Sequence, residues 1–327
     1  MNHGTPPVTD PIVVRAKPAL GIVQLGARPF MPAATQTLID QSFLEKLERL
    51  TIHWQKSFPG LVGGHNASRF AGPGQEFLDH RNFHHGDDLR AVNWRAYMRL
   101  EKLFLKMFQI EPRVPVRLLF DTSLSMGTGE PAKFDYARKL VAALAYVGLV
   151  RLDTIVLNPF AASLGQEHVC SGGRHRFGPA AEYLMKLEMA EATDFTAAAR
   201  RFVSKYVSRG LLVIVSDFLS DGDCEKPLQY LAEFGHELFL VHVWSEEDRT
   251  PPWTGELELT DAETGEHLEL DFDAGARERY TAAFDEHSER IRRVALRHGG
   301  RYVSIPVSMP VEDAVFGPLI RARGVQG

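Results

Sequence analysis

The chain has few cysteines, no long apolar run and no strong excess of one charge. Among its 327 residues only Cys170 and Cys224 are cysteines, too few for a disulfide framework or an all-cysteine metal site. No stretch approaches the roughly 20 consecutive apolar residues of a membrane-spanning helix, and the first residues lack the pattern of a signal peptide. These absences predict a soluble protein of a reducing compartment, and we expect it in the cytoplasm.

The charge balance also limits the possible partners. A formal net charge of −5 gives no overall attraction to nucleic acid or to anionic lipid, so we expect no membrane partner. The chain is long enough for one large domain and a flanking segment, with a hydrophobic core that needs neither disulfides nor metal. Partners must therefore be sought at particular sites.

Composition and periodicity divide the chain into three regions. Residues 1–35 are rich in proline, glycine and alanine and have little apolar periodicity, and we interpret them as a mobile arm. Residues 36–115 contain an amphipathic helix over 38–58, a glycine-rich loop and a half-buried strand over 103–110, which indicate a small amino-terminal α+β module. The third region, residues 116–327, contains the candidate metal ligands.

The third region alternates apolar strands with helices, which indicates right-handed crossovers and a parallel sheet. The pattern predicts strands over 116–120, 154–157, 211–215, 238–244 and 302–306, and helices over 134–152, 179–189, 196–207, 226–234 and 274–298. Two further short strands should form a hairpin around 263–266. Because the strands are continuous apolar runs, we expect helices on both faces of the sheet. The predicted fold class is α/β, with a doubly wound, mainly parallel, Rossmann-like sheet.

Two of the apolar strands lead into acidic residues. One runs into Asp121-Thr-Ser123-Leu-Ser125, and the other runs into Ser-Asp217. In an open α/β sheet, ligands gather beyond the carboxyl ends of the strands, so these oxygen atoms should lie close together. Mg²⁺ prefers oxygen ligands in near-octahedral geometry. The sequence therefore predicts a Mg²⁺ site here, with Mn²⁺ or Ca²⁺ as alternative ions.

A further oxygen ligand could come from the segment before the helix over 196–207. Thr193 and Asp194 both precede this helix, and either side chain could cap it by accepting a backbone hydrogen bond. The Thr193 hydroxyl could instead reach the strand ends. For the serines, too, turn formation and helix capping are alternatives to metal binding.

Taken in order, Asp121-x-Ser123-x-Ser125, then Thr193 and then Asp217 resemble the metal-ion-dependent adhesion site (MIDAS) of von Willebrand factor A-like domains. The resemblance implies that Ser123, Ser125 and Thr193 contact Mg²⁺ directly or through water, and that the two aspartates supply charge. It also implies an open coordination position for the carboxylate of a partner protein. A von Willebrand factor A-like domain over 116–327 is the corresponding expectation for the fold.

A long motif precedes this domain. It reads Gly72-x-Gly74-x-Glu76-Phe77-x-x-x-Arg81-x-Phe83-x-x-Gly86-Asp87-Asp88-x-Arg90-x-x-x-Trp94. The string resembles the signature of the family called domain of unknown function 58, whose members often carry membrane helices and accompany MoxR-type AAA+ ATPases. This chain lacks such helices, and Asn93 stands where an aspartate is usual. The resemblance implies an adaptor or chaperone-like partner of a MoxR-type ATPase.

Two other functions compete with this interpretation. A phosphohydrolase could use Asp121 as its nucleophile beside Mg²⁺. Ser123, however, occupies the position where a haloacid-dehalogenase-type motif needs a second aspartate, so we expect no enzymatic activity. A basic run from Arg90 to Lys106, interleaved with aromatic residues, could contact phosphates and bases. Nearby acidic residues dilute its charge, so nucleic-acid binding is the lesser alternative.

Overall fold

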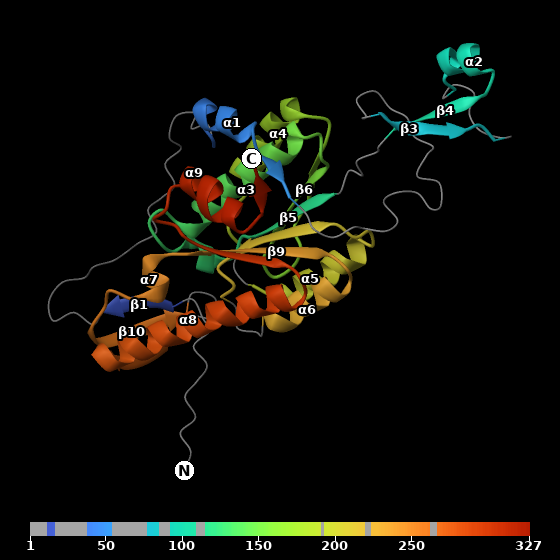
Figure 1. The fold of residues 1–327 in the computed structure, drawn as a ribbon. Coiled ribbons are helices and arrows are strands. Elements are labelled where there is room, and N and C mark those ends of the chain that lie inside the picture. The colour runs from blue at the N-terminus through green and yellow to red at the C-terminus, as the bar shows by residue number, and fades with distance from the viewer. Residues whose placement is uncertain are drawn as a thin grey trace. The chain divides into compact units, whose positions relative to one another are not determined.

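The computed structural model describes residues 12–16, 38–53, 77–84, 92–108, 115–190, 193–219, 224–261 and 267–327. The chain forms two compact units (Figure 1). We call residues 1–56 together with 115–327 the main domain, and residues 57–114 the small module. All the candidate metal ligands belong to the main domain.

A six-stranded sheet lies at the centre of the main domain (Figure 1). Its strands are, in spatial order, β12 (Arg301–Pro306), β9 (Glu237–Trp244), β8 (Leu211–Ser216), β5 (Val116–Asp121), β6 (Ile155–Phe160) and β7 (His168–Cys170). All neighbouring strands are parallel except β6 and β7. From β7 to β12 this is the 3-2-1-4-5-6 order of doubly wound sheets, which confirms the predicted fold class.

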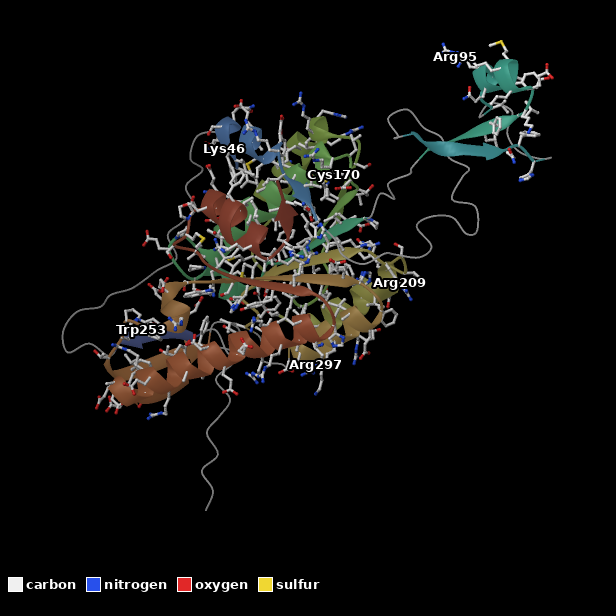
Figure 2. All side chains as sticks on the ribbon, in the orientation of Figure 1. Lys46, Arg95, Cys170, Arg209, Trp253 and Arg297 are labelled. Carbon is white, nitrogen blue, oxygen red and sulfur yellow. The ribbon has the colours of Figure 1, made fainter. Side chains whose placement is uncertain are left out.

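Helices cover both faces of this sheet (Figure 1). One face is covered by α1 (Gln41–Leu47), α3 (Lys133–Val150), α4 (Phe177–Met185) and α9 (Val311–Ala314), and the other by α5 (Phe195–Lys205), α6 (Glu225–Glu233) and α8 (Ala274–Arg297). Successive strand residues enter opposite cores, since Leu118 packs on the α3 side and Leu119 on the α5 side. Side chains fill the space on both sides of the sheet (Figure 2).

The five helices and five strands expected in 116–327 are all present, with their ends shifted by a few residues. The central helix α3 has 18 residues and is buried along most of its length. Close packing explains Gly148 on this helix, because a Cβ atom there would lie 2.3 Å from Cδ1 of Ile155. Among the described residues, no helix is both long and apolar enough to cross a membrane.

The structure corrects the predicted boundary of the small module. Instead of one helix over 38–58, residues 41–47 form α1, and the β-branched pair Thr51–Ile52 forms β2, which is antiparallel to β13 (Val325–Gln326). Leu47 and Ile52 are buried in the core shared with α3. Residues 38–53 therefore belong to the main domain and not to the module predicted over 36–115.

A strand also lies within the segment interpreted as a mobile arm. In that segment, β1 (Ile12–Ala16) pairs with β10 (Gly255–Asp261), which in turn pairs with β11 (His267–Phe272) as the expected hairpin. The apolar run Ile-Val-Val has high strand propensity, which the overall composition of residues 1–35 conceals. The arm interpretation is corrected for these five residues, and the other residues of 1–35 lie outside the described part.

The small module contains a two-stranded antiparallel sheet and one helix. The strands are β3 (Phe77–Asn82) and β4 (Phe104–Phe108), the second of which confirms the strand expected over 103–110. The helix α2 (Trp94–Leu100) has no buried residue, and it carries Arg95, which Figure 2 labels. Asn93 caps this helix by accepting a hydrogen bond from the Ala96 backbone, which suits asparagine at that position. Residues 72–76 and 85–91 of the family-like string lie outside the described residues.

The placement of α1 gives a stability prediction. Leu47→Ala should lower the free energy of unfolding by about 2–4 kcal/mol, because its fully buried side chain leaves a cavity in the main core. Leu100→Ala is the matched control, since Leu100 is 59% exposed on α2 and its loss should have almost no effect. Urea unfolding measures both. Equal effects would contradict the assignment of α1 to the main domain.

Candidate metal centre

Asp121 ends β5 at the carboxyl edge of the sheet and is held by two hydrogen bonds. The register of β5 and β8 pairs Phe120 with Val215, so Asp121 lies level with Ser216. The Ser216 hydroxyl donates to Asp121 Oδ2 at 2.6 Å, and the Ser123 backbone N–H donates to Oδ1 at 2.9 Å. With a side chain this fully buried, the carboxyl group of Asp121 is fixed in place.

The two serines after Asp121 converge as their spacing predicts. Ser123 immediately precedes a short 3₁₀ turn, η2 (Leu124–Gly127), and Ser125 lies within this turn. Their side-chain oxygens lie 2.9 Å apart, and neither residue is exposed. Two neighbouring ligands of an octahedral Mg²⁺, each at about 2.1 Å, would also lie about 3 Å apart. The spacing of the hydroxyls therefore fits a shared cation.

Thr193 lies at the same edge of the sheet. It lines, together with Asp121 and Ser216, a cavity of about 10 Å³, which is roughly the size needed for one water molecule. The neighbouring Asp194 caps α5 by accepting a hydrogen bond from the Ala197 backbone at 2.8 Å. Of the two roles that the sequence left open, Asp194 therefore takes helix capping, and Thr193 lies beside Asp121.

Asp217 follows β8, next to Ser216, and its carboxylate has two hydrogen-bond partners. Its Oδ1 accepts from the Leu219 backbone at 3.0 Å. Its Oδ2 accepts from the ammonium group of Lys133 at 2.8 Å, and this ion pair is buried, with both side chains 1% exposed. The structure thus brings Asp217 to the predicted edge of the sheet, already paired with a positive charge.

Lys133 is the residue of this centre that sequence reasoning missed. Its Nζ also lies 2.9 Å from Oδ2 of Asp248, which belongs to the short helix α7 (Glu246–Arg249) after β9. One signal in the sequence could have identified it. Lys133 is the first residue of α3, and a cation at a helix N-terminus is unfavourable unless acidic groups surround it.

Opposing effects set the charges of the centre. Burial raises the pKa of Asp121 to about 7, the charge of Asp217 adds to this effect, and hydrogen bonds from Ser216 and Ser123 oppose it. Burial lowers the pKa of Lys133, but the charges of Asp217 and Asp248 outweigh burial and hold it above its ordinary value. The centre therefore has an excess of carboxylates, which an additional cation would relieve.

The donor set fits a hard divalent cation. Among the described residues, no group of three or more His, Cys, Asp or Glu side chains is placed to hold a metal, so hydroxyl oxygens would have to complete this site. Two carboxylates and the hydroxyls of Ser123, Ser125 and Thr193 provide only oxygen atoms, which Mg²⁺, Mn²⁺ and Ca²⁺ accept. A carboxylate oxygen can accept more than one hydrogen bond or ligand. The oxygens of Asp121 and Asp217 can therefore still bind a cation beside their observed partners.

A comparison with family models identifies the chain. The model described as "Protein of unknown function DUF58" matches residues 79–290, about two thirds of the 327 residues. The chain belongs to the DUF58 family. The match begins in β3 of the small module and ends in α8, so it includes every candidate metal ligand of this DUF58 chain.

Known proteins similar to this DUF58 chain come from several sources. An uncharacterized protein of Mycobacterium tuberculosis is 25% identical over 279 residues, covering 81% of this chain and 85% of the relative. Among solved structures, BatB from Bacteroides thetaiotaomicron is 16% identical with a TM-score of 0.40, covering 64% of this chain and 98% of that one. The VWA domain of SpRpn10 is 14% identical with a TM-score of 0.36, covering 62% and 93%.

The structure also describes residues of the two competing functions. The carboxyl group of Asp121, the nucleophile of the phosphohydrolase alternative, is 1% exposed, and both of its oxygens accept hydrogen bonds. The basic run from Arg90 to Lys106 falls in the small module, where its aromatic residues Trp94 and Tyr97 lie on α2 with exposed fractions of 53% and 43%. Arg90 itself lies outside the described residues.

The raised pKa of Asp121 gives a prediction for the metal-free protein. Its folded-state pKa of about 7 exceeds the ordinary 3.8, so the stability that this group contributes at low pH is lost as the pH rises toward 7. Asp121→Asn, which keeps the shape, should remove this loss. In chelator, the difference in thermal midpoint, variant minus wild type, should increase as the pH is raised from about 5 to about 8.

Asp285→Asn is the control for this pH series. A hydrogen bond from Arg249 holds the pKa of the exposed Asp285 below its usual value, so this group stays ionised throughout the range. The difference between this variant and the wild type should therefore stay constant. A flat difference for Asp121→Asn as well would show that Asp121 is ionised in the folded protein at all these pH values.

Proposed function

We propose that this DUF58 chain is a protein-interaction module that binds its partner through a divalent cation, with Mg²⁺ as the expected ion and Mn²⁺ or Ca²⁺ as alternatives. The observation that carries the proposal is the convergence of two buried serine hydroxyls, 2.9 Å apart, beside the buried Asp121. Helix capping does not explain this convergence, because neither serine side chain caps η2 or α3.

Each residue has a distinct part in this proposal. Ser123, Ser125 and Thr193 would hold the cation through their hydroxyl oxygens, as in the adhesion site that the motif resembles. Asp121 and Asp217 would supply negative charge, either directly or through bound water. When bound, the cation would supply a positive centre that accepts a carboxylate of the partner protein.

The surroundings of the centre suit a protein partner. The Ala190 backbone N–H donates to the Thr122 carbonyl at 2.7 Å. The segment that carries Met189 therefore lies directly beside residues 122–125, which we call the serine loop. Met189 is 43% exposed, and methionine is enriched in protein interfaces because its side chain adapts to different contacts. A Cβ atom at Gly127 would lie 3.1 Å from the Met189 sulfur, which favours glycine at this position.

The proposed partner is a MoxR-type AAA+ ATPase, for which the chain would act as an adaptor or chaperone-like protein. This part of the proposal rests on the family resemblance of the sequence. We propose a cytoplasmic location, supported by Cys170 and Cys224, which are both buried and are not joined to each other by a disulfide, as expected in a reducing compartment.

We propose that the chain is not an enzyme. A haloacid-dehalogenase-type motif needs a second aspartate two residues after its nucleophile, and Ser123 occupies that position. Nucleic-acid binding through the basic run stays a lesser alternative, and no contact of α2 favours it specifically.

Cation-dependent capture of a purified MoxR-type ATPase from the same organism tests the proposed function. The immobilised chain should retain the ATPase in Mg²⁺ and release it in chelator, because the cation completes the contact with the partner's carboxylate. Ser123→Ala combined with Ser125→Ala should abolish retention with little change in fold, since each change removes one oxygen atom. The Leu100→Ala variant on α2 should bind normally. Retention that is equal in Mg²⁺ and chelator would contradict a cation-dependent contact.

A further inference from the structure

Lys133 places a permanent positive charge inside the candidate metal centre. Its ammonium group is fully buried and lies 2.8 Å from Asp217 Oδ2 and 2.9 Å from Asp248 Oδ2. Asp248 is itself held in place, because it accepts a hydrogen bond from the Ser245 backbone at 2.8 Å and belongs to the capping box of α7. The ammonium group is thus fixed between Asp217, which follows β8, and Asp248 of α7.

This arrangement lets the centre fold without metal. Burying an unpaired carboxylate is costly, and the penalty is relieved by an opposite charge at hydrogen-bond distance. Lys133 provides this charge to Asp217, while the Asp121 carboxyl group relies on hydrogen bonds from Ser216 and Ser123. Without Lys133, the metal-free protein would bury the carboxylate of Asp217 with no cation beside it.

The same ammonium group opposes the binding of a second cation. A divalent ion beside Asp217 would lie within a few ångströms of Lys133, where like charges repel strongly in a buried site. Three ionised carboxylates and one ammonium group have a net charge of −2. One divalent ion would neutralise this charge, and no further cation would be needed. The centre should therefore attract a divalent ion less strongly than the carboxylates alone would.

We propose that Lys133 is an internal counter-cation that stabilises the metal-free centre and weakens its intrinsic affinity for a divalent ion, so that tight cation binding requires the carboxylate of a partner. Lys133 is a positioning residue, since it acts through Asp217 and not by contact with the ion. This inference rests on the proposed function, because it concerns the affinity of the same site. It adds a reason for a cation-dependent contact to be reversible.

Calorimetric titration of Mg²⁺ and Mn²⁺ into two variants tests the effect on affinity. Lys133→Met removes the positive charge at similar length and should tighten divalent-cation binding at least roughly tenfold. Asp248→Asn keeps the capping oxygen but leaves Lys133 with one acid fewer, and should weaken binding. Tighter binding by Lys133→Met together with weaker binding by Asp248→Asn would support the role of Lys133 as a counter-cation. Weaker binding by both variants would show that Lys133 only maintains the structure, and would overturn the inference.

Thermal unfolding in chelator tests whether Lys133 stabilises the metal-free centre. Lys133→Met should lower the midpoint by roughly 5–15 °C, because it leaves buried acids unpaired. Adding Asp217→Asn should restore part of this loss, since the carboxylate that Lys133 neutralises is then gone. Equal or greater loss in the double variant would overturn the inference. Failure of the wild type and both variants to bind any cation would contradict the proposed function, and the chelator measurement would then decide the role of Lys133.

Discussion

The buried carboxylates of Asp121 and Asp217, at the ends of adjacent parallel strands, are the constraint on which the rest of the centre depends. The register of β5 and β8 places them at one edge of the sheet, and both residues are 1% exposed. Acids in such a place need hydrogen bonds and positive charge. Ser216, the serine loop and Lys133 supply these in the metal-free protein, and the surplus of negative charge favours a divalent ion.

Periodicity and strand-end chemistry were sufficient to predict the central part of the structure. Continuous apolar runs predicted β5 and β8, because both faces of these strands are buried, and the alternation of strands with helices predicted α3. The order of Asp121, Ser123, Ser125, Thr193 and Asp217 predicted which residues would meet at the edge of the sheet. Their side chains are found there, and their role as metal ligands stays a prediction.

Contacts between distant parts of the chain account for what the sequence did not reveal. The short β2 becomes a strand by pairing with β13, more than 270 residues later, so local spacing suggested one long helix instead. Lys133 and Asp217 are 84 positions apart, and only the folded sheet brings them together. The edge strand β7 has three residues and a mixed sequence, His-Val-Cys, which gives no clear periodicity.

The proposed function depends on Ser123 and Ser125 sharing one divalent cation. A crystal structure of the protein grown with MnCl₂, with anomalous diffraction measured for manganese, tests it most directly. A shared cation should give one anomalous peak about 2.2 Å from both serine hydroxyl oxygens, with Thr193 and the two aspartates around it. An ordered centre without a peak at saturating Mn²⁺, in which the two hydroxyls remain hydrogen-bonded to each other, would contradict the claim.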